Sequence, residues 1–136
     1  MSVARDHLGL EVLDAAECER LLAESTIGRV AFVRAGSAEL FPVNYAYANK
    51  RVVFRSAVGS KLDAAAIRKG VTFEIDGWDT AAKTGWSVVV TGTLRVVPET
   101  EQERVEALDL VTWISTDHHM QAVEIIPDMV TGRRLK

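Results

Sequence analysis

The chain has 136 residues, 48% of them hydrophobic, which suits one domain with a single core. Its formal net charge of −3 argues against a nucleic-acid-binding protein, since such domains usually carry a strong basic surface. The single cysteine excludes an internal disulfide bond, and no apolar stretch approaches the roughly 20 residues that span a bilayer. With no signal-peptide pattern at the start, we expect a cytoplasmic protein.

The first predicted element is a helix that begins near Asp14. Asp14 can cap this helix, and Glu17, three residues later, completes the pattern of a capping box. Cys18, Leu21 and Leu22 follow at helical spacing and share one face. We therefore expect a short helix that packs this face, including the cysteine, against the core.

Strands dominate the rest of the chain. Six runs rich in β-branched and aromatic residues are predicted as strands: Ile27–Arg34, Leu40–Ala48, Arg51–Ser56, Val71–Asp76, Trp86–Val97 and Gln121–Ile126. The short connections at Ala35–Ser37 and Asn49-Lys50 favour hairpins, because parallel crossovers need a dozen or more residues. The fold class is therefore mainly β (α+β), an antiparallel barrel with helices at its margins.

Three segments between and after the strands complete the prediction. Ser60–Lys69 is expected to form a helix that ends at Gly70, a usual helix stop. The small and polar Gly77–Gly85 is expected to be a loop. The basic tail Gly132–Lys136 is expected to be solvated.

A third helix is predicted from Thr100 to about Thr112. Thr100 and Glu103 have the spacing of a second capping box. The apolar residues of this segment recur at helical spacing. Those expected to face the core are Val105, Leu108 and Val111.

The most informative segment for chemistry is Val53–Leu62. Here a strand delivers Arg55, and a small loop containing Gly59 leads into a helix that starts near Ser60. A helix N-terminus offers unpaired N–H groups to a phosphate, to which Arg55 and Lys61 would add positive charge. In the alternative interpretation, Ser60 is only an N-cap and both cations are solvated.

Three segments in register resemble the pyridoxamine 5'-phosphate oxidase-like family of flavin-binding split barrels. They are Phe41–Tyr45, Val53–Leu62 and Gly85–Gly92. The ending Thr131–Arg134 is also similar to that of short actinobacterial-type members. The resemblance implies one domain over residues 1–136, a six-stranded antiparallel split β-barrel that binds FMN at the interface of a homodimer.

The resemblance also assigns cofactor-binding positions, while catalytic residues stay unknown. The backbone of Val43, Asn44 and Tyr45 would bind the edge of the flavin ring. The positions that would flank the ring and ribityl chain are Phe54, Arg55 and Ser56. Ser60 and Lys61 would hold the phosphate, and Trp86 and Ser87 would reach the flavin from the second subunit.

Each of these positions also has a purely structural interpretation. Tyr45 and Trp86 alternate with apolar residues, as half-buried strand aromatics do. Asn44 and Ser87 could be ordinary polar strand residues.

Glu74 and Asp76, two apart on a strand, share a face that we expect to be solvated. The pair His118-His119 has no further ligand at metal-site spacing, so no metal is expected.

The function that the resemblance implies is an FMN-binding oxidoreductase that passes reducing equivalents to a small-molecule acceptor. Oxidation of pyridoxamine phosphate itself is disfavoured, because that substrate's phosphate would need a second basic cluster. One alternative is a deazaflavin-dependent reductase, whose longer cofactor tail could meet the basic C-terminus. Another is a non-catalytic flavin-binding or flavin-storing protein.

Overall fold

The computed structural model describes residues 3–57, 66–67, 69–113 and 120–136. Its strands form one antiparallel sheet in the order β3-β2-β6-β7-β8-β5-β4, and β1 pairs with β8. The strands are β1 Glu11–Val12, β2 Ile27–Arg34, β3 Ser37–Asn44, β4 Ala46–Ala48, β5 Arg51–Ala57, β6 Val71–Asp79, β7 Thr84–Val96 and β8 Met120–Leu135. The helices are α1 Ala15–Glu24, the 3₁₀ turn η1 Glu99–Glu101 and α3 Gln102–Glu106.

The predicted strand Leu40–Ala48 is bent into two halves, and this bend shapes the barrel. Its first half, β3, pairs with β2, and its second half, β4, pairs with β5. Tyr45 lies at the bend, where it is 4% exposed. The bent strand therefore links the two ends of the sheet. The mainly β, antiparallel split-barrel fold is confirmed, with eight strands instead of six because one is divided and β1 is added.

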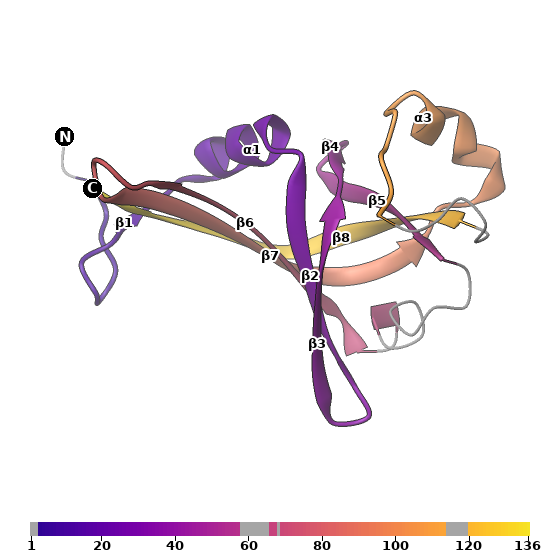
Figure 1. Ribbon diagram of the computed structural model, residues 1–136, viewed down its shortest axis with the longest axis horizontal. Helices are drawn as coiled ribbons and strands as arrows, with labels where there is room; N and C mark the ends of the chain where they lie inside the picture. Colours follow the sequence, from indigo (N-terminus) through magenta and orange to yellow (C-terminus); the bar gives the residue numbers. More distant parts are fainter. Residues whose placement is uncertain (1–2, 58–65, 68, 114–119) are drawn as a thin grey trace.

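Three long strands extend beyond the barrel as an arm. β6, β7 and β8 run side by side toward the N- and C-terminal ends of the chain (Figure 1). The opposite ends of β7 and β8 lie beside β5 and α3 (Figure 1). The two ends of β7 are consequently far apart, which matters for the placement of the predicted site.

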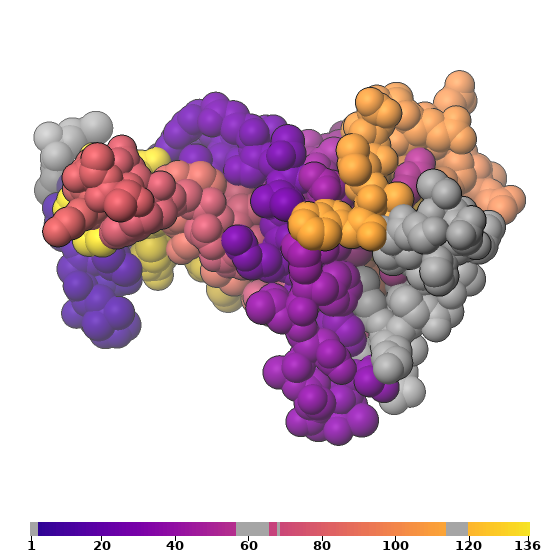
Figure 2. Space-filling model, in the orientation of Figure 1, coloured from indigo at the N-terminus to yellow at the C-terminus, as the bar shows by residue number. Residues whose placement is uncertain are grey.

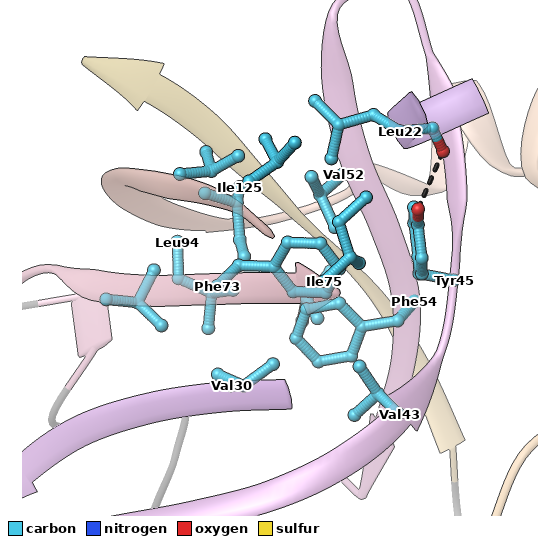
Figure 3. Packing of buried hydrophobic residues seen from close by; sticks show 14 of the residues in the cluster. Leu22, Val30, Val43, Tyr45, Val52, Phe54, Phe73, Ile75, Leu94 and Ile125 are labelled. Carbon is cyan, nitrogen blue, oxygen red and sulfur yellow. Dashed lines mark hydrogen bonds between the residues drawn. The ribbon is translucent and has the colours of Figure 1, made fainter. Parts of the chain in front are cut away.

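The main core fills the inside of the barrel. Phe54, Phe73, Ile75 and Ile125 are almost completely buried there, and Tyr45 stacks edge-on against Phe73 with ring centroids 4.8 Å apart (Figure 3). These side chains come from alternate positions of their strands, as a half-buried sheet requires. A second, smaller cluster of Val53, Val97, Val105 and Ala122 lies on the other face of β5, beneath α3.

Helix α1 forms as its sequence predicts. The Asp14 carboxylate accepts a hydrogen bond from the backbone N–H of Glu17 at 2.8 Å, and Cys18, Leu21 and Leu22 are buried. The Glu17 side chain does not close a capping box, however. It binds Arg20 and Arg134 instead, which ties the helix to the end of β8.

The segment predicted as a loop, Gly77–Gly85, is mostly strand. β6 continues to Asp79, β7 starts at Thr84, and only the turn between them is irregular. The indole of Trp86 lies so close to Gly77 that a Cβ there would be 2.5 Å from its Nε1. Glycine here permits close packing within a strand, which sequence alone does not distinguish from a turn.

The last strand does not end at Pro127 as expected. β8 continues to Leu135, and the register shifts between Thr91 and Gly92, where Gly92 lies opposite Pro127. Such an irregularity accommodates a proline, which has no N–H for the ladder. The basic tail is therefore strand as far as Leu135, and only Lys136 is a solvated end. Arg133 pairs with Asp6 at 3.0 Å, and Arg134 pairs with Glu17 at 2.7 Å.

The helix expected from Thr100 to Thr112 is shorter and starts differently. Its first turn is η1, preceded by Pro98, with no side-chain cap, and α3 ends at Glu106. Val105 is buried as expected, but Val111 is 66% exposed. Among the described residues, none of the helices has the length and apolar character needed to cross a membrane.

Candidate functional site

The bend at Tyr45 separates two strand edges. Among the described residues, β3 has only β2 as a sheet neighbour. β4 covers β5 only as far as Val53, so the stretch from Phe54 to Ala57 pairs with β8 alone. The split of the barrel therefore lies between the end of β3 and the end of β5. These are the strands to which the resemblance assigns the flavin ring.

The open edge of β3 presents backbone groups at Asn44. The backbone N–H of Tyr45 donates to the carbonyl of Thr26 at 3.0 Å, so the hydrogen-bonding groups of Tyr45 face the β2 side of the strand. Antiparallel pairing alternates, which turns the N–H and C=O of Asn44 and the C=O of Pro42 outward. Pro42 fits this position because a proline is tolerated on an edge strand. The β3 edge can therefore donate and accept hydrogen bonds.

The side chain of Asn44 is already engaged. Its amide nitrogen donates to the carbonyl of Thr26 at 3.2 Å, and its amide oxygen accepts from the indole Nε1 of Trp113 at 2.7 Å. In Figure 2 the orange segment after α3 extends onto this part of β3. Trp113 itself is 60% exposed. It was not predicted as a site residue, and its only signal was an aromatic residue in a polar linker.

The three residues assigned on β5 alternate between two faces. Phe54 is fully buried and Ser56 is 5% exposed, and both lie on the face that lines the barrel. Arg55 shares the opposite face with Val53, the side covered by α3. Arg55 is partly exposed. Phe54 therefore cannot meet a ligand with its ring without opening the core, whereas Arg55 can.

Arg55 differs from the other arginines that the structure describes. Each of the others forms a hydrogen bond or an ion pair, as Arg29 does with Glu74 and Asp76 at 3.2 Å. No described residue binds the guanidinium of Arg55 in this way. A guanidinium beside an open strand edge is suited to an anionic group, because it can donate two parallel hydrogen bonds.

The remaining β3 and helix assignments divide into two groups. The side chains of Val43 and Tyr45 belong to the core, 7% and 4% exposed, and the Tyr45 hydroxyl donates to the Leu22 carbonyl. Their backbone groups face β2, so among the three residues assigned to the ring edge Asn44 alone presents its backbone at the open edge. Ser60 and Lys61 lie outside the described residues, so the phosphate-binding corner stays a prediction.

Trp86 and Ser87 lie on the arm and not at the split. They pair with Arg134 and Arg133 of β8 and with Gly77 and Asp76 of β6. Trp86 lines a pocket of about 480 Å³ together with Trp78, Arg134 and Lys136. Within one chain the structure therefore does not bring Trp86 and Ser87 together with Asn44 and Arg55.

Of the acidic pair on β6, Asp76 is exposed as expected and Glu74 is partly buried. Burial, together with the neighbouring Asp76 carboxylate, raises the pKa of Glu74 to about 7, although Arg29 opposes this shift. Both carboxylates share the single guanidinium of Arg29. The raised pKa brings the titration of Glu74 close to neutral pH, but this residue lies on β6 and not at the split.

No metal centre is found in the part of the chain that the structure describes, where no three histidine, cysteine or acidic side chains gather suitably. His118 and His119 fall outside that part. The candidate site therefore consists of backbone donors and acceptors on β3 and a cation on β5.

Comparison with known proteins identifies the family. The family model described as pyridoxamine 5'-phosphate oxidase matches residues 14–134. The chain belongs to this family. It is similar to the uncharacterized protein Rv0080 of Mycobacterium tuberculosis, with 37% identity over 131 residues, which cover 90% of this chain and 84% of the relative.

Solved structures of the same fold include flavoproteins. The FAD-binding protein of Mycobacterium smegmatis has 35% sequence identity and a TM-score of 0.77, with 92% of this chain and 99% of the other covered. An FAD-binding protein of Mesorhizobium loti has a TM-score of 0.75 at 21% identity, covering 93% and 99%, and it supports the fold alone.

Proposed function

We propose that this chain binds a flavin nucleotide at the split between β3 and β5 and serves as an oxidoreductase toward a small-molecule acceptor. One observation carries the proposal. The split has an open strand edge at Asn44, and β5 beside it carries a guanidinium, that of Arg55, which no described residue binds. The 35% identity to a protein described as FAD-binding supports a flavin as the ligand.

The residues at the split fit a flavin in two ways. A flavin ring has a polar edge of carbonyl and N–H groups, which can pair with the outward backbone groups of Asn44 and Pro42. Its ribityl chain ends in a phosphate, for which Arg55 offers a bidentate donor. FMN is the proposed cofactor, and FAD shares the ring, ribityl chain and first phosphate that this fit uses.

The bound flavin would supply the transfer of electrons or hydride. The chain would bind and orient it: the Asn44 N–H would donate to the ring edge, and Arg55 would neutralise the phosphate. Trp113, hydrogen-bonded to Asn44, would cover part of the same edge and limit the access of water.

We propose a homodimer in which each site is completed by the partner's arm. Trp86 and Ser87 lie away from the split of their own chain, so they can act at a flavin only from another copy. Large exposed apolar side chains on and beside the arm, including Trp78 at 61% and Met129 at 61%, suit burial against a second copy. A two-fold arrangement would give two equivalent sites.

The structure removes one argument for a deazaflavin. The arginines that could meet its longer tail, Arg133 and Arg134, are already ion-paired with Asp6 and Glu17. Deazaflavin binding is therefore an outcome of the test and not a second proposal.

A fluorescence titration with FMN, FAD and a deazaflavin coenzyme tests the cofactor. Arg55→Gln should weaken FMN binding about tenfold or more, the effect of losing a charged hydrogen bond. Lys83→Gln removes one positive charge from the exposed β6–β7 turn and should leave affinity unchanged. Equal affinity of the Arg55→Gln variant and the wild type would remove Arg55 from the site.

Turnover and subunit mixing test the remaining parts. Oxidation of a reduced nicotinamide in the presence of FMN and an acceptor supports an oxidoreductase, whereas binding without turnover on a broad acceptor panel favours a storage protein. If sites are shared, mixing Arg55→Gln and Trp86→Ala chains should restore about a quarter of the FMN sites, since only hybrid dimers contain one intact site. No recovery would contradict the shared site.

A further inference from the structure

A second polar pocket lies at the start of β5, on the α3 face of the strand and away from the split at its other end. It has a volume of about 510 Å³ and lies between the β4–β5 turn and the helices η1 and α3. We refer to it as the basic pocket, lined by Asn49, Lys50, Arg51, Glu101 and Arg104. None of these residues takes part in the proposed flavin site.

A buried carboxylate gathers arginines at this pocket. Glu124 is fully buried, and its Oε1 accepts a hydrogen bond from Arg51 at 2.6 Å, while its Oε2 accepts one from Arg104 at 3.0 Å. Arg95 also donates to Oε1, from its Nε at 2.8 Å. Burying a carboxylate requires compensation by charge and hydrogen bonds, but three guanidinium groups exceed what one carboxylate neutralises.

The net charge around the pocket is positive after every described carboxylate in contact is counted. Glu101 pairs with Arg104 at 2.9 Å and with Arg95 at 3.5 Å, and Glu19 pairs with Lys50 at 3.9 Å. The group therefore contains four cations and three carboxylates, with an excess of one positive charge. This excess stands out in a chain of net charge −3.

Donors remain available at the pocket. Arg51 uses only its Nη1 on Glu124, and no described residue binds its Nε or Nη2. Arg104 uses its Nε and Nη2, and its Nη1 has no hydrogen-bond partner among the described residues. The Lys50 side chain is 82% exposed and can reorient. Two pre-oriented guanidinium groups and one mobile ammonium suit a ligand with several anionic oxygens.

The turn that carries Lys50 is strained. Asn49 and Lys50 both have positive φ angles, 53° and 58°. Glycine is usual at the second position of such a hairpin turn, and a lysine there costs about 1 kcal/mol or more. A lysine in that position is consistent with a use for its charge.

We propose that the basic pocket binds a multivalent oxyanion of the phosphate type, either inorganic or as part of a small phosphorylated molecule. Lys50, Arg51 and Arg104 are its ligands. Glu124 acts as a positioning residue, because its two carboxylate oxygens hold the guanidinium groups of Arg51 and Arg104 in place. Arg51 precedes Arg55 by four residues, about 13 Å along the strand, so this site and the flavin site are separate.

Calorimetric titration of the whole protein with inorganic pyrophosphate at low ionic strength tests the proposal. We expect saturable binding of one pyrophosphate per chain. Lys50→Ala should weaken it by up to about fivefold, the effect of one exposed charge interaction. Lys83→Ala is the matched control, because Lys83 is also exposed, lies in a hairpin turn and has a positive φ of 56°. It should bind as the wild type does.

Two further variants separate this site from the flavin site. Arg51→Lys keeps the charge that compensates Glu124 but loses the fork, so pyrophosphate binding should weaken while the protein stays folded. Arg55→Gln should leave pyrophosphate binding unchanged. Binding that does not saturate, equal losses in Lys50→Ala and Lys83→Ala, or a loss in Arg55→Gln alone would each overturn the proposal. Titration with a phosphorylated sugar then distinguishes a free anion from a phosphoryl group on a larger molecule.

Discussion

The hydroxyl of Tyr45 donates a 2.6 Å hydrogen bond to the backbone carbonyl of Leu22 (Figure 3). This contact joins the last turn of α1 to the bend between β3 and β4. The last carbonyls of a helix have no partner within it, so the tyrosine satisfies a group that would otherwise be buried unpaired. Burial raises the pKa of Tyr45 to about 12, so the hydroxyl keeps its proton and the contact persists over the physiological pH range.

Replacing Tyr45 with phenylalanine tests this contact. Tyr45→Phe should lower the free energy of unfolding by about 1–2 kcal/mol, because the Leu22 carbonyl loses its donor. Urea unfolding followed by circular dichroism measures this loss. Tyr47→Phe is the control, since the Tyr47 hydroxyl makes only a long 3.4 Å contact with Glu19, and its loss should be smaller. Equal losses of unfolding free energy in the two variants would show that the hydrogen bond to Leu22 makes no special contribution to stability.

The buried Glu124 should be a stability determinant. Glu124→Gln leaves three guanidinium groups without their central carboxylate, and breaking a buried pair by removing one partner costs about 3–5 kcal/mol. Chemical unfolding at pH 7 measures the effect. Glu103→Gln, an exposed change on α3, should cost almost nothing. A loss for Glu124→Gln no greater than for Glu103→Gln would contradict the role we assign to the cluster.

The same carboxylate should make stability depend on acid pH. Burial alone would raise the pKa of Glu124, but hydrogen bonds from Arg104, Arg95 and Arg51 outweigh it and lower the pKa below the ordinary 4.5. A lowered pKa in the folded state gives a contribution that is present above pH 4.5 and is lost as the pH falls. The stability difference between wild type and Glu124→Gln should therefore shrink in acid, and a constant difference from pH 7 to pH 3 would oppose this assignment.

Glu74 should act in the opposite direction near neutral pH. Burial and the adjacent Asp76 raise its pKa to about 7, so the folded state binds a proton that the unfolded chain releases near pH 4.5. Wild-type stability should therefore decline between about pH 5 and pH 7 relative to Glu74→Gln, which cannot ionise. Urea midpoints at pH 5 and pH 8 measure this, and parallel pH profiles of the two proteins would exclude the effect.

Gly92 should tolerate no side chain. A Cβ at this position would lie 2.1 Å from the backbone carbonyl oxygen of Ile126, and backbone cannot move aside as a flexible side chain can. Gly92→Ala should lose about 3 kcal/mol or more, or fail to fold. Gly9→Ala, whose Cβ meets nothing within 4 Å but whose φ is +83°, should lose about 1 kcal/mol. Thermal unfolding of both variants provides the comparison, and a smaller loss at Gly92 would contradict the close approach.

Local patterns predicted the elements whose signals lie within a few residues. β2 spans Ile27–Arg34 as expected, and α1 begins after Asp14 with the predicted buried face. The third helix failed on the same kind of pattern, because Pro98 precedes a 3₁₀ turn and α3 is only five residues long. A spacing of apolar residues gives the possibility of a helix, but its length depends on what packs against it.

The candidate site could be predicted only in part for a similar reason. Sequence placed Arg55 near a strand end, where the structure also has it, and the structure adds that no described residue binds its guanidinium. Sequence did not show that Phe54 and Arg55 point to opposite faces of a two-sided sheet, nor that Trp113 would donate to Asn44. Those facts depend on which face of β5 is covered by α3 and on a contact between residues 69 positions apart.

The sequence by itself determined the strand-rich fold, the family, the capped first helix and the position of Arg55 near a strand end, because these follow from periodicity and short motifs. Only the tertiary structure decided that β8 runs past Pro127, that Glu124 is buried among three arginines, and that the bend at Tyr45 leaves two strand edges open. Each of these depends on partners far apart in the chain, such as Gly92 opposite Pro127 and Arg51 beside Glu124. A local pattern does not contain the register that brings such partners together.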